Sequence, residues 1–233
     1  MSDYERYGDY NEIEEDAPRG KSPVYLILKI VTAVVCFAVV GLLVFRLVAF
    51  NVYPSQVREL YFNDTLTAHY NADKAGFAVK TQKLRYEYDD EDLGNFFCDH
   101  LYVIEGAGQL QITVRYNVST VERIEAERGI ELDDKSASLF TFRLVDNHGN
   151  VQGELVDSVF ASQMMYRYVK LVFDGVNFTP DSEGKYPEWI RLETFLAGDD
   201  TAVAEPYMNP IYENHKDYAE FVPYEPKKGE LPE

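Results

Sequence analysis

The side chains that could perform acid–base or metal chemistry are few and scattered along this chain. The four histidines are His69, His100, His148 and His215, and no two of them stand at the spacing of a metal-binding pair. Asp99 directly precedes His100, but neighbouring residues on a strand point to opposite faces of a sheet. His148 falls in a turn sequence, where exposure alone explains it. The histidines therefore predict neither a catalytic nor a metal-binding site.

The densest group of oxygen ligands is the acidic run Tyr88-Asp89-Asp90-Glu91-Asp92. A calcium ion requires several oxygen ligands, but this run lacks the residue order and the glycine of an EF-hand loop. We interpret it as a solvated, charged turn rather than a calcium site. Cys98 has no activating motif beside it, so we interpret it as a buried core thiol.

Short catalytic motifs are absent from the sequence. It contains no GxSxG, no P-loop, no HExxH and no GxGxxG before a helix. Trp189 together with Tyr166, Tyr168 and Phe195 could form an aromatic platform for a sugar or a peptide, but we favour a sandwich core around the single tryptophan. Paired carboxylates for glycoside hydrolysis would converge only in three dimensions. We therefore assign no catalytic, cofactor-binding or metal-binding residue and expect no cofactor.

Charge and cysteine content narrow the possible partners. The 233 residues carry a formal net charge of −18, which repels nucleic acid and anionic lipid, and no stripe of Lys and Arg reverses this. The two cysteines, Cys36 and Cys98, lie in an apolar segment and in a polar domain, so they cannot easily pair. A domain without disulfides outside the cytoplasm fits a bacterial envelope better than an animal cell surface.

One apolar segment, Val24 to Phe50, predicts a membrane-spanning helix. Sixteen uncharged residues separate Lys29 from Arg46, and apolar residues extend the run on both sides. A bilayer core of about 30 Å needs roughly 20 helical residues. The two charges lie near opposite ends, where their long side chains can reach the head groups. The segment before it is long and acidic and no good cleavage site follows, so we interpret residues 24–50 as an uncleaved signal anchor.

The distribution of basic residues predicts the orientation of this anchor. An excess of Lys and Arg marks the cytoplasmic side of a membrane span. Four basic residues lie before the span or at its start, namely Arg6, Arg19, Lys21 and Lys29. Two lie at its end or after it, namely Arg46 and Arg58. We expect a single-pass protein of the cell membrane with a disordered, acidic cytoplasmic tail at residues 1–23. The domain after the span would then lie outside the cytoplasm.

The rest of the chain predicts a mainly β fold, an antiparallel β-sandwich preceded by one transmembrane α-helix. Residues 51–75 read as a juxtamembrane connector, and residues 76–204 alternate with a period of two between Gly, Asn and Asp turns. Hairpins are expected around Gly106-Ala107-Gly108 and around residues 147–150, and a short helix begins with a capping box at Ser119. Apolar side chains should face inward and polar ones outward. Residues 205–233 form a Pro- and Tyr-rich extension whose prolines exclude regular structure.

The layout resembles a loose group of uncharacterised single-pass envelope proteins of Gram-positive, Clostridia-like bacteria. The resemblance covers Ser2 to Phe195 and includes the phrase YRYVKLVFDGV, and it implies an immunoglobulin-like or jelly-roll-like β domain. No functional residue follows from it. We therefore expect a non-enzymatic, membrane-anchored module that binds a protein or an envelope polymer, with its oligomeric state open. The alternatives are an envelope enzyme that acts on carbohydrate through convergent carboxylates and a structural subunit of a membrane complex.

Overall fold

The computed structural model describes residues 23–51, 53–83, 96–179, 182–184, 187, 189–204, 207–208 and 222–232. The chain divides into two compact units, Met1–Asn51 and Val52–Glu233. Almost the whole predicted tail at residues 1–23, the acidic run from Tyr88 to Asp92 and His215 lie outside the described residues.

The first unit contains helix α1, Pro23–Asn51. Its stretch Pro23–Val48 is long and apolar enough to cross a membrane, and its side chains are exposed rather than packed. At about 1.5 Å per residue this stretch is longer than the roughly 30 Å hydrocarbon core of a bilayer. The prediction of one apolar helix before the β domain is confirmed.

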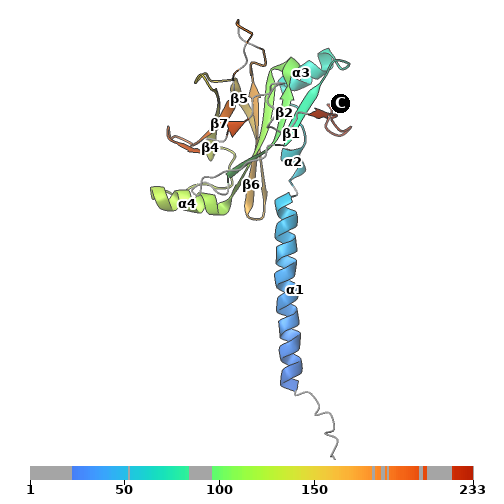
Figure 1. Cartoon of the computed structure of the whole chain (residues 1–233), viewed down its shortest axis with the longest axis vertical. Helices are drawn as coiled ribbons and strands as arrows, with labels where there is room; N and C mark the ends of the chain where they lie inside the picture. The colour runs from blue at the N-terminus through green and yellow to red at the C-terminus, as the bar shows by residue number, and fades with distance from the viewer. Residues whose placement is uncertain are drawn as a thin grey trace, which may run out of the picture. The chain divides into compact units, whose positions relative to one another are not determined.

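The second unit contains two antiparallel sheets (Figure 1). The large sheet has the order β10-β1-β2-β3-β6-β5, and the small sheet has the order β4-β7-β8, with β9 also paired to β7. The large sheet comprises β1 Val79–Lys83, β2 Phe96–Ile104, β3 Gln109–Asn117, β5 Glu154–Gln163, β6 Tyr166–Asp174 and β10 Val222–Tyr224. The small sheet comprises β4 Phe140–Asp146, β7 Ile190–Leu196, β8 Ala202–Ala204 and β9 Tyr207–Met208. The predicted mainly β, antiparallel fold is confirmed.

Within the described residues, short helical segments join or cover the strands: α2 Ser55–Arg58, α3 Asp64–Ala72, the 3₁₀ turn η1 Glu105–Ala107, and α4 Val118–Arg128. The predicted hairpin at the Gly106 turn is confirmed, because η1 joins β2 to β3 and Gly108 adopts a left-handed conformation with φ 61°. The cap of α4 differs from the prediction, since Asn117 rather than Ser119 is the N-cap and accepts a hydrogen bond from the Ser119 amide.

Two strand predictions were wrong. The turn at residues 147–150 does not close a hairpin, because β4 pairs with β7 in the small sheet whereas β5 pairs with β6 in the large one. In the described part of the chain, the two sides of this turn are joined by the isolated bridge between Val145 and Val151 rather than by a strand pair. The prolines after residue 204 do not exclude regular structure either, because β10 carries Pro223 at the edge of the large sheet, where one face of the backbone needs no partner.

The main core lies between the two sheets. Alternate residues of β3, namely Leu110, Ile112, Val114 and Tyr116, pack with apolar residues of β4, β6 and β7, as the period-two pattern predicted. Burial of this apolar surface is the main source of stability for such a sandwich, at about 25 cal/mol per Å².

The other face of the large sheet is also buried, although its side chains are polar. Gln109, Gln111, Thr113 and Arg115 alternate with the apolar residues of β3 and are at most 3% exposed. The expectation that polar residues of this sheet face solvent was therefore wrong. Residues 53–66, which we call the N-terminal strap, cover this face, although the sequence predicts a juxtamembrane connector there.

Side chains of the sheet bind the backbone of the strap. Gln111 forms two hydrogen bonds with Tyr61, since its Nε2 donates to the carbonyl oxygen (2.6 Å) and its Oε1 accepts from the amide (2.9 Å). Thr113 Oγ1 donates to the carbonyl of Val57 (2.6 Å). Main-chain groups of the strap thus satisfy Gln111 and Thr113, while Gln109 donates to the side chains of Asn63 and Asp174. Such partners are the condition for burying polar side chains at low cost.

Apolar residues of the strap complete the contact. Val57 packs with Ala161, Tyr166 and Tyr168, and Leu66 lies fully buried in a cluster with Tyr102 and Ile104. Asn63 caps α3, because its Oδ1 accepts from the Leu66 amide. The strap is therefore an integral layer of the domain, and the compact unit begins at Val52.

Lys170 is the one lysine among the described residues that is fully buried. It lies on β6, donates from Nζ to the carbonyl of Glu59 in the strap, and sits 4.9 Å from the centre of the Tyr102 ring. Burial lowers the pKa of Lys170 from 10.5 to about 7, and the carboxylates of Glu230 and Glu59 only partly offset this effect.

We predict that this lysine makes the stability of the domain depend on pH. Between about pH 7 and pH 10 the unfolded chain binds a proton on Lys170 that the folded chain does not. The free energy of unfolding should therefore rise with pH across this interval, by at most about 1.4 kcal/mol per pH unit. Lys170→Met should remove this rise in denaturant titrations, whereas exposed Lys135→Met should keep it. An equal pH dependence in wild type and Lys170→Met would contradict the prediction.

Candidate functional site

The outer face of the small sheet presents a cluster of charged and aromatic side chains. Phe142, Leu144 and Leu192 point into the core, so the alternate positions on β4 and β7 point outward. The register places Arg143 directly opposite Glu193 across the strand pair. Arg191 stands two residues before Glu193 on the same face of β7, so the three side chains meet.

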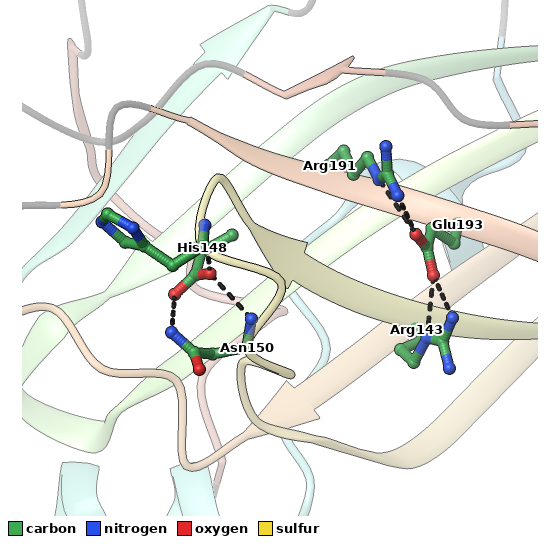
Figure 2. Close-up of polar contacts among 6 residues, drawn as sticks. Arg143, His148, Asn150, Arg191 and Glu193 are labelled. Carbon is green, nitrogen blue, oxygen red and sulfur yellow. Dashed lines mark hydrogen bonds and ion pairs between the residues drawn. The ribbon is translucent and has the colours of Figure 1, made fainter.

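Glu193 binds both arginines at once (Figure 2). Its Oε2 accepts from Nε (2.8 Å) and Nη2 of Arg143, and its Oε1 accepts from Nε (2.9 Å) and Nη2 of Arg191. The carboxylate is only 4% exposed, whereas the side chain of Arg143 is 49% exposed. The buried carboxylate thus bridges two guanidinium groups that reach the surface.

The electrostatics of this cluster keep Glu193 ionised. Burial by itself would raise the pKa of Glu193, but the hydrogen bonds and positive charges of Arg143 and Arg191 outweigh burial and hold the pKa below 4.5. Glu193 therefore cannot act as a proton donor near neutral pH. The three charges leave the cluster with one net positive charge on a strongly acidic chain.

Aromatic rings support both guanidinium groups. The Cζ atom of Arg143 lies 5.0 Å from the centre of the Phe195 ring, and that of Arg191 lies 5.6 Å from the Trp189 ring. Such contacts restrict the arginine side chains and add cation–π attraction. The core that we expected around Trp189 is not found, because Trp189 is only partly buried and does not belong to the core cluster. The alternative, an aromatic platform, is split, because Trp189 and Phe195 lie here whereas Tyr166 and Tyr168 lie beneath the strap on the large sheet.

A hollow of about 410 Å³ adjoins this cluster, and its walls are Thr141, Phe142, Arg143, Phe195, Asp199 and Asp200. Asp199 is already paired with Arg128 at the end of α4. Arg143 binds Glu193 through Nε and Nη2, so that Nη1 is available to a ligand within the described part of the chain. The hollow therefore offers one half-exposed guanidinium beside an aromatic ring, a hydroxyl and the carboxylate of Asp200.

A second polar cluster lies in the turn after β4 and has a structural role. Buried Asp146 accepts hydrogen bonds from the amides of His148 (2.9 Å) and Asn150 (2.8 Å) and from the side chains of Asn150 and Gln152. Burial raises the pKa of Asp146, but these four donors more than compensate and hold it below its usual range. The ring of His148 stays exposed, as the turn sequence predicted, and Figure 2 shows His148 and Asn150 in this turn.

The other residues considered from sequence do not converge. Cys98 is buried in the core, as predicted. His69 lies on α3, and His100 lies on β2 with its ring 5.9 Å from that of Tyr53. Among the residues that the structure describes, no three His, Cys, Asp or Glu side chains gather as metal ligands do. Sequence reasoning missed Arg143, Arg191 and Glu193, because only strand pairing brings β4 and β7 together.

Comparisons with known proteins do not place the chain in a family. It matches no protein-family model, no curated protein and no solved structure. Its function must therefore be argued from its own residues.

We predict that Glu193→Gln destabilises the domain and reduces its sensitivity to acid. Because the folded pKa of Glu193 lies below its ordinary value, its contribution is complete above about pH 4.5 and is lost as pH falls through the folded pKa. At pH 7 the substitution should lower the free energy of unfolding by about 1–3 kcal/mol, as expected for a neutralised, nearly buried partner. Denaturant titrations between pH 3 and pH 7 measure both effects. Glu127→Gln, at an exposed position, is the control and should behave as wild type. If Glu193→Gln leaves the free energy of unfolding unchanged, the electrostatic role of Glu193 is refuted.

Proposed function

We propose that this protein is a membrane-anchored, non-enzymatic binding module of the cell envelope. In this proposal α1 is an uncleaved signal anchor, the N-terminus is cytoplasmic and the β domain lies outside. The length and apolar character of α1 and the excess of basic residues before it support this topology. The resemblance to single-pass envelope proteins in layout points the same way.

The single observation that carries the binding role is the half-exposed Arg143 guanidinium held by buried Glu193. A guanidinium fixed by a carboxylate and an aromatic ring loses little freedom when it binds a second anion. Its natural partner is a carboxylate or phosphate oxygen. Since the chain as a whole carries a net charge of −18, it repels dense polyanions and favours a partner with isolated acidic groups.

The same cluster argues against the carbohydrate-cleaving alternative at this site. A glycosidase needs one carboxyl group that donates a proton and a second carboxylate nearby. Glu193 is held ionised by two arginines, and Asp199 is paired with Arg128. We therefore propose recognition of an acidic group on an envelope polymer or protein, rather than catalysis.

We predict that Arg143→Ala weakens binding of a carboxylate-bearing ligand. The probe is a set of soluble peptidoglycan fragments, and the same fragments with amidated carboxyl groups are the matched ligand control. Full-length wild type in nanodiscs should bind the acidic fragments at least about tenfold more tightly than Arg143→Ala, since one charged hydrogen bond is worth about 1.5–3 kcal/mol. Titration calorimetry measures the affinity.

Arg58→Ala is the matched protein control, because the side chain of Arg58 is 45% exposed and paired with Glu59 but lies on α2. It should bind as wild type. Equal binding by Arg143→Ala and wild type, or equal binding of acidic and amidated fragments, would contradict the proposed site. Binding of no fragment, with a stable protein partner recovered from detergent extracts, would favour the structural-subunit alternative.

A cysteine-labelling experiment in intact cells tests the predicted orientation. In a Cys36→Ser background, one variant carries Ser2→Cys and another His148→Cys; the latter position is exposed and its side chain is not needed by the Asp146 turn. A membrane-impermeant thiol reagent should label only the second variant. Labelling of the first variant alone would reverse the proposed topology.

A further inference from the structure

The turn between β5 and β6 has an unusual residue at its apex. Gln163 pairs with Tyr166, so the turn consists of Met164 and Met165 alone. Met164 has a φ of 55° and is the only non-glycine residue with positive φ in the described part of the chain. Its side chain is 50% exposed. Glycine is the residue that a two-residue hairpin with this backbone ordinarily carries at that position.

Neighbouring groups hold this turn in place. Arg167 Nη1 donates to the carbonyl of Met164 (2.9 Å), and the Val118 amide donates to the carbonyl of Met165 (3.0 Å). Arg167 is itself fixed by an ion pair with Asp134 (2.7 Å). Backbone strain of this kind persists where the surroundings enforce it, and it often marks a functional position. The fold therefore presents an apolar side chain on a rigid, strained apex where glycine would be less costly.

The turn lies close to the point where the domain meets the anchor in the sequence. Met165 and Tyr53 pack against one cluster, formed by Val57, Ala161, Tyr166 and Tyr168. The guanidinium carbon of Arg115 lies 5.6 Å from the centre of the Tyr53 ring and 5.2 Å from that of Tyr166. Tyr53 follows Asn51, the last residue of α1, by two positions, so their Cα atoms are at most about 7 Å apart.

We propose that the Met164–Met165 turn is a second membrane contact, which inserts the Met164 side chain into the interfacial layer of the bilayer that α1 crosses. This inference rests on the proposed anchoring. Tyrosine beside the end of a span is typical of the membrane interface, and apolar tips are suited to shallow insertion there. The contact is apolar rather than electrostatic, because the acidic chain does not attract anionic lipid. Since Val52 alone separates α1 from Tyr53, which packs in the same cluster as Met165, the chain connection gives even a weak contact a high effective concentration.

Methyl NMR of the unmodified side chain tests this inference. Full-length protein with ¹³C-methyl methionine and valine is placed in nanodiscs of zwitterionic lipid that contain a fraction of spin-labelled lipid. The Met164 methyl signal, assigned with Met164→Leu, should be broadened severalfold more than the methyl signals of Val156, which is exposed on strand β5 seven residues before its end at the turn. If the protein enters nanodiscs but Met164 is broadened no more than Val156, the inference is wrong and the anchoring stands. If the protein does not enter nanodiscs, the anchoring itself fails.

Met164→Gly separates membrane contact from folding. Glycine accepts positive φ without strain, so the variant should be at least as stable as wild type in thermal unfolding. It should nevertheless increase the wobble of the domain on the nanodisc, measured as a faster decay of fluorescence anisotropy from a dye at His148→Cys. Val156→Ala, which shortens an apolar side chain that is 47% exposed on β5, should leave the anisotropy decay unchanged. An unchanged decay in Met164→Gly would overturn the inference.

Discussion

Burial of polar side chains beneath the N-terminal strap is the constraint on which the rest of the domain depends. The large sheet has two covered faces, and only one of them is apolar. Gln111 and Thr113 could not be buried without partners, because an unpaired buried polar group costs about 1–3 kcal/mol. The backbone of residues 57–61 supplies those partners. The strap thus forms a layer over the sheet, and the polar side chains of the sheet bind mainly to the main chain of this layer.

This arrangement places the segment that follows α1 in the sequence against the centre of the fold. The strap begins two residues after α1 and binds β3 and β6, which are interior strands of the large sheet. A tension on the strap would therefore act on central strands rather than on a loose edge. Lys170 makes the same contact dependent on pH. Burial lowers the pKa of Lys170, and its Nζ atom donates to the carbonyl oxygen of Glu59 in the strap.

The small sheet differs from the large one, because its outer face is exposed to solvent. There the polar residues are charged and aromatic, and buried Glu193 organises Arg143 and Arg191 into fixed positions. The two exposed layers of the domain therefore differ in kind: the strap covers the polar face of the large sheet, and the outer face of the small sheet presents two arginines fixed by Glu193. The turn that contains Met164 lies beside the strap, since Met165 packs against the same cluster as Tyr53.

The sequence by itself determined the local features of this protein. The long apolar run at Val24–Phe50 specifies a helix because of its length, and the alternation in Gln109–Asn117 specifies a strand because side chains of a strand point to opposite faces. It also showed that Cys98 belongs to the core. What it could not show was what each face contacts. Polar residues on β3 read as solvent-facing, although residues fifty positions earlier cover them. The partner of β4 is β7 rather than β5, and this choice alone brings Arg143 to Glu193. Only the tertiary structure decides such matters, because a period of two defines the faces of a strand but carries no information about the distant segment that packs on them.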